Sequence, residues 1–360
     1  MMNFAEITLD ILFNILFILS IFKISQIQSN TIDVEQENGF SQGLLLAVFV
    51  AVMLGTYDIG WEISYDRENY ASYFLHYANY DVPWNEILFE GEWLFNSYMK
   101  ALSFLGDPQY WLLCTAFIYT FNYYIVARRV APENVYILLL AMVSSFCFIG
   151  YGTNTIRAGF ALSFVLVGFS YYQNLFQSLL LFFIAYNIHH STAIPIAAFF
   201  VAKCYDKPKF FYSFWFICVA LSAVAGGYFT TLFSSLGQDF DNRVDYLTTT
   251  ETHYHTGFRI DFILYSFLPI IIGYIYQNRL NYNNSFYTIL HSTYVISNAF
   301  WVLVIRANFS DRFAYLSWFM YALVMVYPLL DQPEHFENAG KKLALTLLFI
   351  SGFTYYMYLK

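Results

Sequence analysis

The sequence predicts an all-α protein that crosses a lipid bilayer many times. Hydrophobic residues fill 59% of its 360 positions and charged residues only 12%, which is too apolar for an ordinary water-soluble domain. Apolar runs of roughly 17–25 residues, the length of a membrane-crossing helix, recur from end to end. We therefore expect a polytopic membrane protein with about 12 transmembrane helices (about 11–13) in a single membrane domain over residues 1–360.

The expected spans follow one another along the chain as separate apolar runs. The runs that are long enough to cross singly are 7–23, 41–57, 109–127, 134–150, 156–172, 210–229, 260–277, 286–304, 313–330 and 343–359. Two shorter runs, 175–188 and 191–202, meet at His189 and His190. Each reaches only about 20 Å, against roughly 30 Å of hydrocarbon. We expect the two histidines to lie at a turn below the outer membrane surface.

Basic residues give the orientation of the chain. Most lysines, including Lys203, Lys207 and Lys209, fall in loops on one side, which the positive-inside rule assigns to the cytoplasm. The outer side then carries both chain termini, most of the acidic residues, and two large loops, 58–108 and 230–259.

The first outer loop contains an expected surface helix. Polar side chains recur there at helical spacing, at Glu92, Asn96, Lys100 and Ser103, with apolar and aromatic residues between them. A helix with one polar and one apolar face lies on a membrane more favourably than through it. We expect an amphipathic surface helix over residues 91–106.

Aromatic and acidic side chains share one face in the same loop. Asp66, Tyr70 and Tyr73 are spaced by four and three residues, which places them on one helical face. Aromatic rings stack on the apolar faces of sugars, so Tyr70, Tyr73 and Trp93 are candidate glycan-binding residues. The same aromatics also fit an interfacial belt that needs no ligand. Asp66 is a candidate general base or, alternatively, the N-cap of its helix.

Arginines stand at the outer ends of several expected spans. Cations at a membrane edge are costly and are usually paired or functional, and the planar guanidinium binds two phosphate oxygens at once. Arg157 opens its span, beside a helix N-terminus that already favours an anion. The candidate diphosphate-binding residues are Arg157, Arg259, Arg306 and Arg312. Asp261 and Asp311 offer the alternative of structural ion pairs with Arg259 and Arg312.

One motif in the second outer loop is typical of metal-dependent enzymes. Asp239-Phe240-Asp241 has the D-x-D spacing of nucleotide-sugar transferases. Arg243 and Asp245 follow it, and nucleotide sugars are absent outside the cell, so we interpret the segment as a solvated acidic loop. We expect no metal and no cofactor.

Four segments together resemble the EpsG family, which belongs with the Wzy-type polysaccharide polymerases. They are Tyr65–Tyr70 with Phe74, a glutamate before the amphipathic helix (Glu90 or Glu92), Ile156–Ala161, and Ala185–Ile194. The likeness extends over about residues 40–330, and the order and spacing of the segments carry it.

The resemblance implies a GT-C-like membrane glycosyltransferase in the bacterial cytoplasmic (inner) membrane, with its active site facing outside; the GT-C kinship is a fold-level analogy. The implied reaction transfers a growing glycan from polyprenyl diphosphate to a sugar hydroxyl of a lipid-linked repeat unit. The implied partners are this lipid-linked oligosaccharide, the lipid bilayer and a chain-length co-polymerase. No nucleic-acid partner is expected.

The acceptor hydroxyl requires a base, and the sequence leaves two candidates. Asp66 stands at the mouth of the membrane domain. The imidazole of His190 suits proton transfer at neutral pH, and His190 precedes Ser191 as the family's histidine precedes its serine. We group His189 and Glu92 with the glycan-binding residues.

Two other functions share these features. One is a transporter (flippase) of lipid-linked oligosaccharide, and the other is a ligase that moves finished glycan to a terminal acceptor. Transporters usually have broken helices in matching halves, whereas this sequence shows a single break, at His189-His190. We therefore favour the polymerase.

Overall fold

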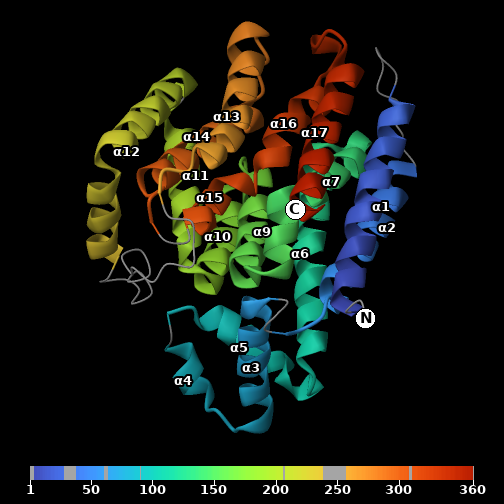
Figure 1. The fold of residues 1–360 in the computed structure, drawn as a ribbon, viewed down its shortest axis with the longest axis vertical. Helices are drawn as coiled ribbons and strands as arrows, with labels where there is room; N and C mark the ends of the chain where they lie inside the picture. Colours follow the sequence, from blue (N-terminus) through green and yellow to red (C-terminus); the bar gives the residue numbers. More distant parts are fainter. Residues whose placement is uncertain are drawn as a thin grey trace. The chain divides into compact units, whose positions relative to one another are not determined.

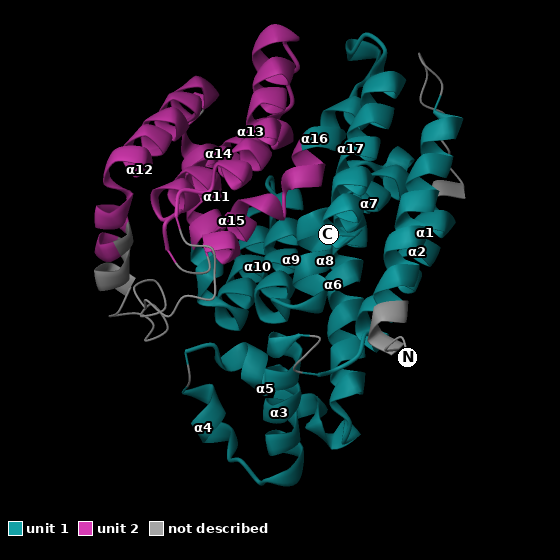
Figure 2. Ribbon diagram, in the orientation of Figure 1, with its two compact units in different colours: residues 1–193, 325–360 teal, residues 194–324 magenta. Residues whose placement is uncertain are grey.

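The computed structural model of the protein describes residues 4–27, 38–60, 64–89, 91–205, 207–237, 257–307 and 310–359. Helices occupy most of these residues, and no β-strand occurs among them (Figure 1). The expected all-α fold is therefore confirmed for the described part of the chain. The chain forms two compact units: unit 1 comprises Met1–Ala193 and Met325–Lys360, and unit 2 comprises Ile194–Val324 (Figure 2).

Unit 1 gathers helices from both ends of the chain. They are α1 (Phe4–Gln26), α2 (Asn38–Thr56), α3 (Tyr65–Asn79), α4 (Trp84–Leu88), α5 (Trp93–Leu102), α6 (Pro108–Val130), α7 (Val135–Val143), α8 (Phe146–Thr153), α9 (Ile156–Ser170), α10 (Leu175–Ile188), the later part of α16 (Tyr321–Asp331) and α17 (Ala339–Leu359). Helix α2 packs on α6, and α9 packs on both α6 and α10. Apolar side chains such as Leu138, Leu162 and Val165 are fully buried in this core.

Unit 2 is also helical. It comprises α11 (Ala193–Cys204) from its second residue, α12 (Pro208–Gly237), α13 (Ile260–Tyr274), α14 (Ser285–Leu303), α15 (Ser310–Trp318) and the first residues of α16. Helix α12 leaves helical backbone geometry at Ala225 and packs on α14, where Trp215 Nε1 donates to Asn298 Oδ1 at 2.7 Å. A π-helical turn, Ile275–Arg279, continues α13.

The predicted spans all fall on helices, but fewer helices than expected can cross a membrane alone. Within the described ranges, five are long and apolar enough: Thr8–Gln26, Pro208–Phe229, Ile260–Arg279, Ser310–Asp331 and Ala339–Leu359. These helices support a polytopic membrane protein. Several of the other expected spans are shorter apolar helices of 10–17 residues, and α14 carries buried polar side chains such as His291 and Asn298. The expected count of about 12 is not confirmed.

The predicted break at the two histidines is confirmed. Helix α10 ends at Ile188, a single 3₁₀ turn covers His190–Thr192, and α11 begins at Ala193. His189 between them has extended backbone angles (φ −155°, ψ 117°).

The prediction of one continuous span over 134–150 is wrong. Helices α7 and α8 meet at a bend of 67°, because Ser145 has extended backbone angles (φ −78°, ψ 143°). The Ser145 hydroxyl donates to the Met142 carbonyl at 2.7 Å, which stabilises the end of α7. The described residues therefore contain a second helix break besides the one at His189-His190, and a single break no longer distinguishes this protein from a transporter.

The segment predicted to be the first outer loop contains three helices, α3, α4 and α5, which group at one end of unit 1 (Figure 1). The expected surface helix over 91–106 corresponds to α5 and a 3₁₀ turn, Ser103–Leu105, and it buries Phe95 and Met99. Glu92 departs from the expected polar stripe. It occupies the N-cap position of α5 and is 5% exposed, because it contacts other helices.

The segment predicted to be the second outer loop begins in a helix. The sequence suggested a loop over 230–259, but α12 continues to Gly237. The D-x-D segment, Asp239-Phe240-Asp241, lies outside the described residues.

Candidate functional site

A buried carboxylate connects three distant segments of unit 1. Glu92 Oε2 lies 2.6 Å from Arg157 Nη1, and Glu92 Oε1 lies 2.6 Å from His189 Nδ1. Glu92 precedes α5, Arg157 is the second residue of α9, and His189 follows α10. We call these three residues the Glu92 cluster. It brings together Arg157, expected to bind diphosphate, and two residues expected to bind glycan.

Charged and polar groups surround the buried carboxylate of Glu92. The side chain of Glu92 is 4% exposed, whereas those of Arg157 and His189 are each 22% exposed. An isolated buried carboxylate costs several kcal/mol, and charged hydrogen-bond partners compensate much of that cost. The backbone N–H of His190 also donates to Glu92 Oε1, at 3.1 Å. The arrangement leaves the arginine and the histidine as the groups that reach solvent.

Aromatic side chains form the surroundings of the Glu92 cluster. The Arg157 guanidinium lies 5.9 Å from the Tyr70 ring and 5.8 Å from the Phe95 ring, within the range of cation–π attraction. Trp93 Nε1 donates to Asn187 Oδ1 at 2.6 Å, which joins the start of α5 to the last turn of α10. Of the expected glycan-binding residues, Tyr70 and Trp93 therefore lie at the cluster.

Tyr73 lies elsewhere on α3 and is 61% exposed. The rings of Tyr65 on α3, Tyr80 just after α3 and Trp84 on α4 are also exposed. These aromatics are available to a ligand or to a membrane interface.

The two adjacent histidines have different environments. The ring of His189 contacts Glu92, whereas the ring of His190 stacks on Tyr186, with centroids 4.7 Å apart and planes inclined by 24°. Only the backbone of His190 contacts the carboxylate. A Cβ atom at Gly91 would lie 3.0 Å from His190 Cε1, so a small residue suits that position. The sequence left Asp66 and His190 as the two candidate bases, whereas the ring that contacts Glu92 is that of His189.

Asp66 lies in the first turn of α3 and is partly buried. The alternative that Asp66 caps this helix is wrong, because the N-cap is Ser64, whose Oγ accepts from the Arg67 N–H at 3.4 Å. The Ser64 hydroxyl also reaches the end of α8, 3.2 Å from the Thr153 carbonyl. Helix α3 is therefore anchored near the segment that precedes Arg157.

Sequence reasoning assigned no role to Arg67, which is buried to 1% exposure. Its Nη1 and Nη2 donate to the carbonyls of Leu54 and Tyr57, at 3.3 and 2.5 Å, at the end of α2. A cation at a helix C-terminus is electrostatically favourable. Burial lowers the pKa of Arg67 to about 10. The only signal in the sequence is its place inside the Tyr65–Tyr70 segment.

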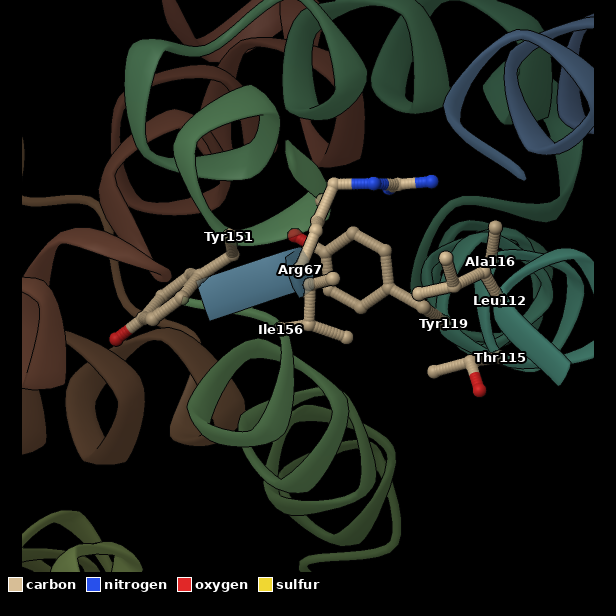
Figure 3. Close-up of a pocket in the computed structure, with 8 residues that line it drawn as sticks. Arg67, Leu112, Thr115, Ala116, Tyr119, Tyr151 and Ile156 are labelled. Atoms are coloured by element: carbon tan, nitrogen blue, oxygen red, sulfur yellow. The ribbon is translucent and has the colours of Figure 1, made fainter. Parts of the chain in front are cut away.

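A small cavity of about 10 Å³ lies beside Arg67 (Figure 3). Figure 3 shows Tyr151 of α8 on one side of it and the α6 residues Leu112, Thr115, Ala116 and Tyr119 on the other. Ile156, the neighbour of Arg157, also lines it.

The other candidate arginines belong to unit 2. Arg259 forms a bidentate pair with Asp261, with Nε–Oδ1 at 3.0 Å and Nη2–Oδ2 at 2.6 Å, which confirms the structural ion pair as its environment. Arg306 is exposed, and its Nη2 donates to the Ala223 carbonyl at 3.3 Å, near the bend of α12. Arg312 is exposed on α15.

No group of three His, Cys, Asp or Glu side chains is placed to hold a metal ion within the described ranges.

The comparisons with known proteins gave one match. The sequence model of the EpsG family matches residues 43–360, which include all of the Glu92 cluster. No curated protein matches the chain, and no solved structure does.

Proposed function

Because the chain belongs to the EpsG family, we propose that it is a glycosyltransferase that polymerises lipid-linked repeat units of a polysaccharide. The family indicates a polysaccharide polymerase in general terms, and the long apolar helices indicate a membrane protein. The proposal adds the substrate and the place: repeat units on polyprenyl diphosphate, at the outer face of the bacterial cytoplasmic membrane, with a chain-length co-polymerase as partner.

The Glu92 cluster is the observation that carries the proposal. A transferase needs a group that accepts a proton, a cation beside the leaving group and a surface that holds sugar rings. The cluster supplies an imidazole and a guanidinium, each 22% exposed, beside the aromatic rings of Tyr70 and Trp93. These groups come from α3, α5, α9 and the residue that follows α10, so they are far apart in the sequence.

The leaving group sets the role of the arginines. When a glycosidic bond to diphosphate breaks, negative charge develops on the departing oxygen, and cations placed there lower the barrier. Arg157 is the proposed first contact of the diphosphate, because part of its side chain reaches solvent at the start of α9. Arg259, Arg306 and Arg312 of unit 2 were also predicted from the sequence to bind diphosphate. Of these, Arg306 and Arg312 are exposed, whereas Arg259 is paired with Asp261.

A flippase remains the second candidate because of the bent α7–α8 pair. Discontinuous helices at a substrate site are typical of transporters, and this chain has a bend of 67° there besides the break at His189. An experiment on the proposed function must therefore separate export of the repeat unit from its polymerisation.

The test is to delete the gene and resolve the surface polysaccharide by size. Loss of a polymerase leaves material that ends after one repeat unit, loss of a flippase leaves no surface material, and loss of a ligase leaves long chains on the carrier lipid. We expect the first pattern. Long chains at the surface of the deletion strain would contradict the proposal.

Complementation then tests the site. Arg157→Ala should restore membrane insertion but not chain extension. Arg128→Ala, the same change at an exposed arginine at the end of α6, should restore both. Normal chain lengths in the Arg157→Ala strain would contradict the role of Arg157 in diphosphate binding.

A further inference from the structure

We infer that His189 is the general base that deprotonates the acceptor hydroxyl, and that Glu92 is the residue that positions it. The inference rests on the proposed glycosyl transfer and assigns a step of it to particular atoms. It replaces the two bases that the sequence suggested, Asp66 and His190, with a residue that the sequence grouped with glycan binding.

The contact with Glu92 selects one tautomer of His189. A carboxylate oxygen accepts hydrogen bonds, so the short contact of 2.6 Å between Glu92 Oε1 and His189 Nδ1 places a proton on Nδ1. The other ring nitrogen, Nε2, then carries the lone pair that accepts a proton. A carboxylate that holds Nδ1–H in this way also stabilises the imidazolium that forms when Nε2 is protonated.

The backbone around His189 is held on both sides. Its N–H donates to the Ala185 carbonyl at 2.9 Å, and its carbonyl accepts from the Thr192 hydroxyl at 2.8 Å and from the Thr192 N–H at 3.1 Å. Thr192 is fully buried. The hydrogen bonds at the break between α10 and α11 therefore fix the position of the His189 backbone, and Glu92 fixes the orientation of its ring.

The carboxylate is fixed as well. Its Oε1 accepts from the His190 N–H and its Oε2 lies against Arg157, so Glu92 has contacts from α9 and from the turn after α10. Glu92 is too buried to meet a substrate, whereas His189 is 22% exposed. We therefore assign the contact with the acceptor to His189, and the orientation of the His189 ring to Glu92.

The ring of the neighbouring histidine lacks this support. His190 stacks on Tyr186 and presents only its backbone N–H to the carboxylate. Stacking does not select a tautomer.

The acceptor oxygen attacks the anomeric carbon of the donor and forms the new glycosidic bond. The bond between that carbon and the diphosphate oxygen breaks, and its electron pair leaves with the diphosphate. The acceptor proton moves to His189 Nε2. Because Arg157 balances the charge of Glu92, the cluster gains one positive charge as the departing diphosphate gains negative charge, which is favourable electrostatically.

The test uses the full chain in lipid vesicles with lipid-linked repeat units, and it measures kcat and KM for chain extension. His189→Asn retains a side-chain N–H for Glu92 but has no basic nitrogen, so we expect kcat to fall about 100-fold or more. Glu92→Gln removes the charge and retains the shape, and we expect kcat to fall at least about 10-fold with KM changed less than about 3-fold. Glu86→Gln, at an exposed glutamate of the same loop, should match wild type.

Rescue separates a base from a structural residue. His189→Gly should be slow, and added imidazole should raise its rate, because imidazole supplies the missing nitrogen. The same imidazole should not help His189→Asn, in which the amide fills the site. A His189→Asn variant that stays within about 3-fold of wild-type kcat would overturn the inference. If wild-type protein formed no polymer at all, the proposed function itself would fail.

Discussion

Removing either charged partner of the Arg157–Glu92 pair should destabilise unit 1 strongly, and removing both should cost less than the sum. The two side chains meet at 2.6 Å, and Glu92 is nearly inaccessible to solvent. Truncation of one side chain leaves the other charge without its oppositely charged partner. The relevant variants are Glu92→Ala, Arg157→Ala and the double substitution.

The structure sets the expected magnitudes. Loss of one partner of a buried ion pair costs about 3–5 kcal/mol. Because 22% of the Arg157 side chain is exposed, its uncompensated charge is partly hydrated, and we reduce this contribution for Glu92→Ala to about 2–3 kcal/mol. That variant also loses the acceptor for His189 and for the His190 N–H, at about 1 kcal/mol each. We expect about 4–5 kcal/mol for Glu92→Ala and about 3–5 kcal/mol for Arg157→Ala.

The double substitution leaves no unpaired charge at this position. We expect a coupling energy of about 2–3 kcal/mol between the two changes. The assay is unfolding of the purified protein in mixed micelles by added denaturing detergent, followed by circular dichroism, with the free energy of unfolding compared among the four proteins. The control pair is Glu86→Ala and Arg128→Ala, at exposed sites on α4 and α6. Their effects on the free energy of unfolding should be additive. Additivity of the Glu92 and Arg157 changes within about 0.5 kcal/mol would refute the reasoning.

Two further substitutions test the packing beside the site. In Gly159→Ala the new Cβ would lie 2.5 Å from Tyr151 Cβ, so α9 must move away from α8; we expect a loss of about 2 kcal/mol by thermal unfolding, whereas Gly352→Ala meets open space and should cost nothing measurable. Equal melting temperatures for the two would contradict this. Arg67→Lys should cost about 1–3 kcal/mol in the detergent assay, because one ammonium does not reproduce the two contacts with Leu54 and Tyr57; unchanged stability would show that these contacts are unimportant.

The helices were predictable because hydrophobic periodicity and length depend on nearby residues alone. The break at His189-His190 was predictable for the same reason, since two polar rings interrupt an apolar run. The bend at Ser144-Ser145 was not, because serine is tolerated inside apolar helices through hydroxyl bonds to preceding carbonyls. The Ser145 hydroxyl makes such a bond to the Met142 carbonyl, but Ser145 itself lies beyond the end of α7, in extended backbone geometry.

The number of spans was less predictable than their positions. Hydropathy identifies apolar runs, but short helices such as α9, of 15 residues, and α10, of 14, do not reach across the hydrocarbon alone.

The candidate site was only partly predictable. Each member of the Glu92 cluster was singled out from its residue type, but contacts across 65 residues (Glu92 to Arg157) and 97 residues (Glu92 to His189) leave no local pattern. Helical spacing placed Glu92 on a solvent-facing stripe, and burial against α9 and α10 overrode that spacing. Likewise, Ser64 rather than Asp66 became the N-cap of α3, a choice that intrinsic preference does not decide because both residues cap well.

The most direct measurement of the central claim is polymerisation by the purified protein alone. Wild-type protein in lipid vesicles would receive fluorescent repeat units on polyprenyl diphosphate, and the products would be separated by size. We predict a ladder of products that differ by one repeat unit, with release of polyprenyl diphosphate, and no ladder with Arg157→Ala. Repeat units that cross the bilayer without lengthening, or that remain unchanged, would contradict the assignment of this chain as a polymerase.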